Sequence, residues 1–474
     1  MSFVSFEFVA FFAVVLIVRS LIRSESTEKW FLLAASYLFY MSWNVYCGFL
    51  LMSISFIDYF VGVGLGRLQS RPYRRLLLTV SIGANLGILA FFKYTNFLLD
   101  NVGSGISALG FQVQPWHYDI LLPVGISFFT FQSMTYTIET YRRNIQACHS
   151  PRDFLLFVSF FPQLLSGPIN RAVDLLPQFA KRVRATPLEF EAGLALFALG
   201  AVKKLVISDQ IAPNVDLIFS NPGGYDGFTL LQGALGYAVQ IYCDFSGYSD
   251  MAIGCARMMG FKFMDNFRMP YSAVNITEFW RRWHISLSSW FRDYLYIPLG
   301  GSRKGTERTY VNLMVTMLLC GLWHGASWNF VFWGGLHGVS LAAHRAWKAW
   351  NPFTLRNNGP AVRLIGSLCA RFLTLSVVVV GWIFFRARSW TLAWTYLSRM
   401  ATWSQDGTGM VSPYILPALA AVVGAHLLVN KDFDWVEEIP HQAASVRIAC
   451  YVGLVLCIVC LGAADSAPFI YFQF

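Results

Sequence analysis

The sequence predicts an all-α protein that crosses a membrane many times. Of its 474 residues, 56% are hydrophobic and only 13% are charged, whereas a typical soluble domain carries about 25% charged residues. Polar residues form short islands between apolar runs of about 20 residues, the length of helix that spans a bilayer. This composition excludes a disordered chain, a collagen-like chain and an ordinary soluble enzyme. We expect about 11–12 transmembrane helices in one membrane-embedded domain covering residues 1–474.

The net charge is +10, from 36 basic and 26 acidic residues. In a membrane protein such a surplus collects in cytoplasmic loops, and no basic patch sits on a soluble module, so we expect no nucleic-acid partner. Most of the nine cysteines lie inside apolar runs, which argues against a disulfide framework. No His or Cys spacing predicts a metal site.

The first apolar runs alternate with basic islands, and this alternation predicts a topology. Glu7 precedes the first run while Arg19 and Arg23 follow it, which places the N-terminus outside and argues against a cleavable signal. The expected membrane segments in this part of the chain are 3–18, 30–46, 47–66, 76–99 and 119–141.

The next apolar run, 153–168, is short and contains Pro162, Gly167 and Pro168. Basic islands flank it on both sides, so a full span would put one island outside. A re-entrant segment keeps both islands inside, and such irregular backbone is tolerated where it lines a cavity. We interpret 160–168 as part of a cavity wall; a short tilted span is the alternative.

The remaining runs complete the count. The expected segments are 188–207, 229–254, 309–328, 329–344, 364–385, 412–429 and 447–463. Loops 208–228 and 386–411 should lie outside. The long stretch 255–308 should lie on the cytoplasmic side, because it carries Arg257, Lys262, Arg268, Arg281, Arg282, Arg292, Arg303, Lys304 and Arg308.

His324 is the first candidate for chemistry. It follows the start of its run by about 15 residues, roughly 22 Å along a helix and past the bilayer centre. Trp323 precedes it, and Gly321 and Gly325 would let backbones or a substrate approach closely. A neutral imidazole there suits a general base. The alternative is a histidine bonded to a neighbouring helix.

A second candidate region is 275–300. Asn275 and Glu278 resemble a helix-start box, and an aromatic stripe follows at helical spacing. The stretch suits either a plain interfacial helix or a funnel that attracts an anionic donor such as a coenzyme A thioester. In the funnel interpretation His284 would orient a substrate carbonyl, and the lining would include Trp280, Arg281, Trp283 and Ser288.

A third region, 241–254, places Asp244, Tyr248 and Asp250 near the cytoplasmic end of a span. Asp244 and Tyr248 share a helix face. We include all three as candidate funnel-lining residues. Ser246 lacks the G-x-S-x-G pattern of a nucleophile elbow and is rejected as a nucleophile.

Together these stretches resemble the membrane-bound O-acyltransferase family, and within it the bacterial branch of alginate O-acetyltransferase membrane subunits. The motifs are Tyr-Cys-Asp-Phe-Ser-Gly-Tyr-Ser-Asp-Met-Ala-Ile-Gly at 242–254, Asn-Ile-Thr-Glu-Phe-Trp-Arg-Arg-Trp-His-Ile-Ser-Leu-Ser at 275–288, Asp-Tyr-Leu-Tyr-Ile-Pro-Leu-Gly-Gly at 293–301 and Gly-Leu-Trp-His-Gly-Ala at 321–326. The resemblance covers nearly the whole chain, with a motif core at about 91–345.

The resemblance implies a ring of helices around a central funnel, with His324 as the essential histidine and His284 as the second active-site position. It implies acetyl transfer from a cytoplasmic thioester, with acetyl-CoA as the expected donor and no bound cofactor. The acceptor would be an exopolysaccharide such as alginate or cellulose, reached across the bacterial inner membrane through periplasmic SGNH-type acetyltransferase partners. The chain would then work within a polysaccharide synthesis and secretion complex, in contact with membrane lipid.

Two other classes of function remain open from the sequence. One is a transporter or flippase without its own chemistry, which would more often show inverted repeats; none is visible. The other is a scaffold subunit of a secretion complex. Neither the polymer nor the partners can be read from the residues.

Overall fold

The all-α prediction is confirmed by a computed structural model of the chain. The structure describes residues 1–111, 114, 116–165, 167–350, 359–428, 435–463 and 467–472, and within these ranges every regular element is a helix. Two compact units emerge. The first comprises residues 1–197 and 248–264, and the second comprises 198–247 and 265–474. Two long helices, α9 (Pro187–Ala201) and α11 (Gly227–Met258), begin in one unit and end in the other.

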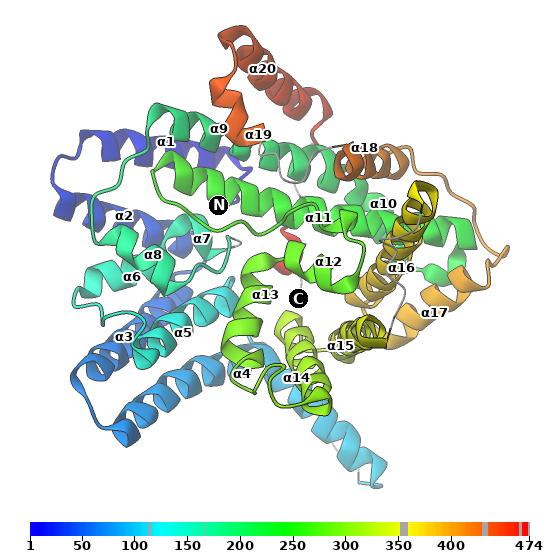
Figure 1. The fold of residues 1–474 in the computed structure, drawn as a ribbon, viewed down its shortest axis with the longest axis horizontal. Helices are drawn as coiled ribbons and strands as arrows, with labels where there is room; N and C mark the ends of the chain where they lie inside the picture. Colours follow the sequence, from blue (N-terminus) through cyan, green and yellow to red (C-terminus); the bar gives the residue numbers. More distant parts are fainter. Residues whose placement is uncertain are drawn as a thin grey trace. The chain divides into compact units, whose positions relative to one another are not determined.

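The first unit is built from helices, and the first four follow one another through short turns (Figure 1). Side chains of Ser5, Ser24 and Asn44 accept hydrogen bonds from the first turns of α1, α2 and α3, which satisfies backbone donors that have no partner within the helix. Its complete helices are α1 (Phe6–Leu21), α2 (Glu25–Met41), α3 (Val45–Arg67), α4 (Arg71–Ala108), α5 (Ile126–Arg142), α6 (Pro151–Ser159), α7 (Phe161–Leu164) and α8 (Ala172–Phe179).

The expected irregular segment at 153–168 is indeed broken. Helix α6 ends at Ser159, Phe160 leaves the helical region with φ −52° and ψ 112°, and α7 adds four residues. Residues 154–164 are buried, and Pro162 stands in the first turn of α7. Neither helix is long enough to cross a bilayer at 1.5 Å per residue. Ser166, within the expected cavity wall, lies outside the described residues.

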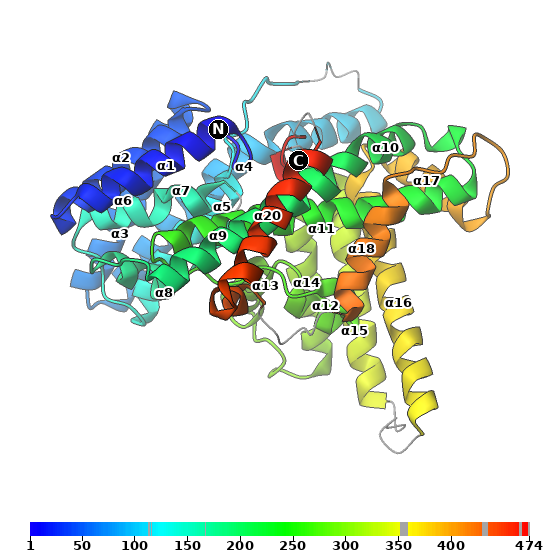
Figure 2. The ribbon, with the colours of Figure 1, turned by 90° about the horizontal axis from the view of Figure 1, so that it is seen from above.

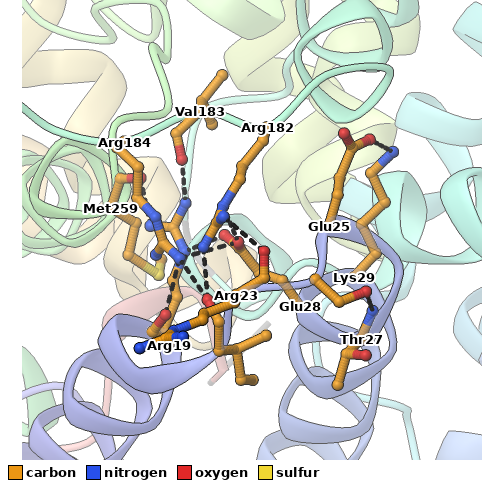
Figure 3. A network of polar contacts seen from close by, with 12 residues as sticks. Arg19, Arg23, Glu25, Thr27, Glu28, Lys29, Arg182, Val183, Arg184 and Met259 are labelled. Atoms are coloured by element: carbon orange, nitrogen blue, oxygen red, sulfur yellow. Dashed lines mark hydrogen bonds and ion pairs between the residues drawn. The ribbon is translucent and has the colours of Figure 1, made fainter.

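A cluster of three arginines around one glutamate ties the N-terminal helices to residues 182–184; we call Arg19, Arg182, Arg184 and Glu28 the arginine cluster (Figure 3). Glu28 accepts from Arg19 Nε at 2.7 Å, from Arg182 Nε at 2.9 Å and from Arg184 at 3.0 Å. Arg182 also donates to carbonyls at residues 22 and 23, and Arg184 donates to the carbonyl of Arg19. The cluster therefore satisfies carbonyls that the end of α1 leaves open.

The second unit carries the remaining helices. Helices α14, α15 and α16 lie side by side in both views (Figures 1 and 2). The elements of this unit are η1 (Val202–Ser208), α10 (Asp209–Ser220), η2 (Pro222–Gly224), η3 (Pro270–Ser272), α12 (Ile276–Arg282), α13 (Ile285–Phe291), η4 (Arg292–Tyr296), α14 (Thr306–His324), α15 (Trp328–Trp350), α16 (Pro360–Arg386), α17 (Trp390–Ala401), α18 (Ile415–Leu428), α19 (Trp435–Glu438), η6 (Ile439–His441), α20 (Ala444–Leu461) and η7 (Ile470–Phe472).

Two expected outer loops each contain a helix. Residues 208–228 contain α10, because the π-helical stretch η1 continues α9 directly into it. Residues 386–411 contain α17, which begins where the side chain of Ser389 accepts from the backbone N–H of Leu392. Both helices carry polar residues among the apolar ones, so a search for uninterrupted apolar runs misses them.

Four helices of the described chain are long and apolar enough to cross a membrane: α3, α4, α16 and α20. The protein is thus an all-α polytopic membrane protein. The larger number of passes expected from the sequence stays a prediction.

Candidate active site

His324 is the last residue of α14, at the turn of a tight helical hairpin with α15. The two backbones touch through glycines: a methyl group on Gly321 would overlap the carbonyl oxygen of Phe330, and one on Gly334 would overlap that of Met317. This close approach is the role that the sequence suggested for the small neighbours of His324. His324 itself is only 3% exposed, so the hairpin holds its imidazole inside the protein.

The aromatic stripe at 275–291 forms two short helices, not the single helix that its spacing predicts. Helix α12 ends at Arg282, Trp283 is extended, and His284 has φ 44° and ψ 56°, in the left-handed region. Such a conformation is strained for a residue other than glycine, and it tends to occur where function requires it. The break turns His284 away from the face on which a continuous helix would place it.

Asn266 is the reason that the break is stable. Its backbone carbonyl accepts from Ile285 N–H at 2.9 Å, and its side-chain oxygen accepts from the N–H and hydroxyl of Ser286. At the other end of α12 the predicted helix-start box is confirmed, since Asn275 caps the N–H of Glu278 at 2.8 Å and Glu278 accepts from Val274 N–H.

The two histidines contact the same two aromatic rings. The ring of Trp323 lies 5.0 Å from that of His324 and 6.0 Å from that of His284, measured between centroids. Tyr471 lies 5.6 Å from His324 and 6.4 Å from His284. Residues 40 positions apart in the chain are thereby gathered into one packed aromatic cluster; we call His284, His324, Trp323 and Tyr471 the chamber.

Burial decides the charge of His284. Its side chain has no exposed surface, and desolvation lowers its pKa to about 3. The imidazole is therefore neutral across the physiological range and offers one N–H donor and one acceptor nitrogen. Phe245, 4.6 Å away, contributes to this apolar environment.

A second aromatic layer surrounds the chamber. Trp333 lies 4.9 Å from His324 and 4.7 Å from His337, so it packs on both. The predicted residue Trp280 packs on His337 at 5.1 Å, and the predicted residue Trp283 packs on Trp382 at 4.9 Å. The predicted tryptophans Trp280 and Trp283 thus pack in this layer, where they support the histidines by close packing.

The other predicted residues divide between the units. Asp244 lies in the second unit and is 1% exposed, paired with Lys204 at 2.7 Å. Tyr248 lies in the first unit, hydrogen-bonded to Ser2 at 2.8 Å, and Asp250 lies there too, half-buried. Arg281 is exposed, Gly325 is buried beside His324, and Ser288 is half-buried and donates to the carbonyl of Trp283.

The basic stretch near His284 is less cationic than its composition suggests. Arg268, Arg282 and Arg292 each pair with a neighbouring acid, Asp265, Glu278 and Asp293 respectively. Arg303 and Lys304 are exposed, like Arg281.

Two residues at this site escaped the sequence reasoning. Tyr471 lies within the aromatic string Pro-Phe-Ile-Tyr-Phe at 468–472, and this density of rings outside any apolar run was an available signal. Lys204 stands inside an expected span, where an ionisable side chain points to function by default.

A family model for membrane-bound O-acyltransferases matches residues 72–373, a range that contains both histidines of the chamber. The chain belongs to the membrane-bound O-acyltransferase family. It is an O-acyltransferase, as its sequence motifs predict.

Its relatives agree with this assignment. A protein of Pseudomonas aeruginosa named "Probable alginate O-acetylase AlgI" is 42% identical over 85% of this chain and 76% of its own length. A protein of the same name from Pseudomonas putida is 39% identical over 94% of both chains. A "Peptidoglycan O-acetyltransferase" of Helicobacter pylori is 36% identical over 79% of this chain and 73% of its own length.

Proposed function

We propose that this protein transfers acetyl groups to an exopolysaccharide at the bacterial inner membrane. The relatives that support this are named for alginate and peptidoglycan O-acetylation. The observation that carries the chemistry is the pair of buried histidines, His284 and His324, in contact with the same tryptophan and tyrosine rings.

In the proposed reaction an acetyl thioester, with acetyl-CoA as the expected donor, enters from the cytoplasmic side. A ring nitrogen of His324 takes the proton of the acceptor hydroxyl as its oxygen bonds to the acetyl carbon. The carbon–sulfur bond then breaks, and the proton passes from His324 to the leaving thiolate. Exposed Arg281, Arg303 and Lys304 provide positive charge for the anionic donor.

We assign His284 a different role, in which its imidazole stays neutral because burial lowers its pKa. A neutral imidazole can donate its N–H to the carbonyl oxygen of the thioester and to the oxyanion that develops there. Because His284 is buried among aromatic rings, this donor is already fixed in place and needs little reorganisation during the reaction. His284 is therefore proposed to polarise the carbonyl, and His324 to move the proton.

The acceptor is proposed to be reached from the outer face through periplasmic acetyltransferase partners, within a polysaccharide synthesis and secretion complex. The gene neighbourhood would identify the polymer, since a cellulose synthase or an alginate polymerase next door would decide between those two glycans.

The test compares His324→Ala with His337→Gln in cells that make the polymer. Polymer acetyl content and the membrane level of each tagged protein are both measured. We expect His324→Ala to lose at least a hundredfold of its acetylation at a normal protein level. The control, His337→Gln, changes another buried histidine, which packs on Trp333 and is outside the proposed reacting pair, and should stay active.

Full acetylation by His324→Ala would overturn the catalytic proposal and favour a scaffold or a transporter. His284→Ala should slow the transfer without lowering the amount of protein; a loss of protein alone would make His284 structural.

A further inference from the structure

Lys204, in the second unit, is a completely buried lysine. It lies in the π-helical stretch η1, with no exposed side-chain surface, and its Nζ lies 2.7 Å from Asp209 Oδ1 and 2.7 Å from Asp244 Oδ1. We call these three residues the lysine cluster. Buried ions carry a high desolvation cost, and they rarely stabilise a fold better than apolar side chains of similar size. The lysine cluster is therefore better explained by the binding of a particular part of the protein than by a contribution to stability.

The lysine cluster holds one particular piece of backbone. Lys204 Nζ donates to the carbonyl of Ala467 at 2.7 Å, and Asp244 Oδ2 accepts from the N–H of Ile470 at 2.8 Å. Ile470 is 3% exposed, and the chain from Ala467 to Phe469 has no regular secondary structure. The position of this segment is thus fixed through side chains more than 220 residues away in sequence.

The next residue after Ile470 is Tyr471, whose ring contacts both histidines of the chamber. Its ring also lies 4.4 Å from that of Phe245, which follows Asp244 directly in α11. Holding Ile470 to Asp244 therefore holds Tyr471 against the reacting groups. The residues before Ile470 have no regular secondary structure, and Tyr471 itself lies in the single 3-10 turn η7, so this segment has little regular structure of its own to keep the ring in place.

We propose that Lys204 and Asp244 are positioning residues for acyl transfer. They bind the backbone of 467–470 and so keep the Tyr471 ring against His284 and His324. The inference rests on the proposed function for its effect on rate, while the tether itself can be measured without any turnover.

The sharpest variant removes one tethering hydrogen bond and leaves the charges alone. Ile470→Pro deletes the N–H that Asp244 accepts, at the first position of a 3-10 turn, where proline is tolerated. Ile470→Val is the matched control, since it keeps the N–H and most of the apolar volume. Asp244→Ala and Asp244→Asn form a second pair, because the asparagine oxygen can still accept from Ile470.

Two measurements compare the full-length proteins. Hydrogen–deuterium exchange is measured on each protein in nanodiscs. The transfer of radiolabelled acetyl from acetyl-CoA to polysaccharide is measured in membranes that contain the cell's own partner proteins. We expect Ile470→Pro and Asp244→Ala to speed amide exchange in 467–472 at least tenfold and to lower kcat at least tenfold, with KM for acetyl-CoA within twofold. In Ile470→Val and Asp244→Asn, amide exchange in 467–472 should stay slow and kcat should stay close to that of the wild type.

The control for general damage is Glu28→Gln, which disturbs a buried carboxylate in the arginine cluster of the first unit and should leave exchange in 467–472 unchanged. Unchanged exchange in Ile470→Pro, or fast exchange with full kcat, would overturn the positioning role. Full activity of His324→Ala would instead overturn the proposed function and leave the exchange result standing.

Discussion

The two units each contain a charged cluster, and the clusters are opposite in composition. In the arginine cluster three cations surround one carboxylate, and the side chains of Arg182 and Arg184 remain 33% and 37% exposed. In the lysine cluster one cation serves two carboxylates, with side-chain exposures of 0–2%. Water can solvate the surplus charge of the first cluster and cannot reach that of the second.

The clusters also bind different backbone groups. The arginines donate to carbonyls at the end of α1, where helices leave acceptors open and favour positive charge. The lysine cluster accepts from the N–H of Ile470 and donates to the carbonyl of Ala467, in a segment that is irregular up to the short 3-10 turn η7. The first arrangement fastens a helix end, while the second fixes an irregular segment beside the site. A partly exposed charge keeps much of its hydration, so its desolvation cost is low. A fully buried charge has a high desolvation cost, which a specific role of the charged group would explain.

The largest effect should come from removing the single cation. Lys204→Met leaves Asp209 and Asp244 buried without their common partner, which we expect to cost about 3–5 kcal/mol of unfolding free energy. Thermal unfolding in detergent measures it. The neutral triple variant Lys204→Met, Asp209→Asn, Asp244→Asn should recover most of the loss, because no uncompensated charge remains. If Lys204→Met had the same melting temperature as the wild type, water would have to reach Asp209 and Asp244 despite their burial.

The arginine cluster should respond less to the corresponding change. Glu28→Gln removes the carboxylate that three arginines share, yet Arg182 and Arg184 keep their carbonyl acceptors and part of their hydration. We expect a loss of about 1–3 kcal/mol, measured in the same unfolding assay. If Glu28→Gln proved as costly as Lys204→Met, exposure would not be what separates the two clusters.

Local signals in the sequence predicted the parts of the site that local chemistry builds. The start of α12 follows from the spacing of Asn275 and Glu278, and the break at Phe160 follows from the nearby proline. The close approach of α14 and α15 beside His324 follows from the small residues next to it, Gly321 and Gly325. Each of these features depends on residues within one or two helical turns.

Long-range features could not be predicted in the same way. The left-handed backbone of His284 opposes its intrinsic preference and exists because Asn266, 18 residues earlier, binds the following turn. The approach of Tyr471 depends on a hydrogen bond between residues 226 positions apart. Periodicity reports which face of an element is apolar, and it carries no information about which distant segment covers that face.

The acid sensitivity of the chamber should be smaller than either cluster effect near neutral pH. The folded-state pKa of His284, about 3, lies below its ordinary value of 6.5. Below pH 6.5 the unfolded chain binds a proton that the folded protein does not, so stability falls as pH falls toward 3. At pH 5.5 the loss is on the order of 1 kcal/mol. His284→Asn, which suits a left-handed position, should lose less stability than the wild type between pH 7.5 and 5.5. Equal losses in both proteins would mean that His284 gains a proton in the folded state.

The smallest effect should come from the rim of the arginine cluster. Arg184→Ala removes a guanidinium that is 37% exposed and shares its carboxylate with two other arginines. Exposed pairs contribute about 0.2–1 kcal/mol, and salt screens them. We therefore expect a small drop in melting temperature at low salt that shrinks as salt is raised. The Lys204→Met deficit should not shrink, because ions do not reach the enclosed pair. If the loss of melting temperature in Lys204→Met also shrank with added salt, the lysine cluster would be accessible to ions. The two clusters would then not differ in solvation, contrary to our interpretation.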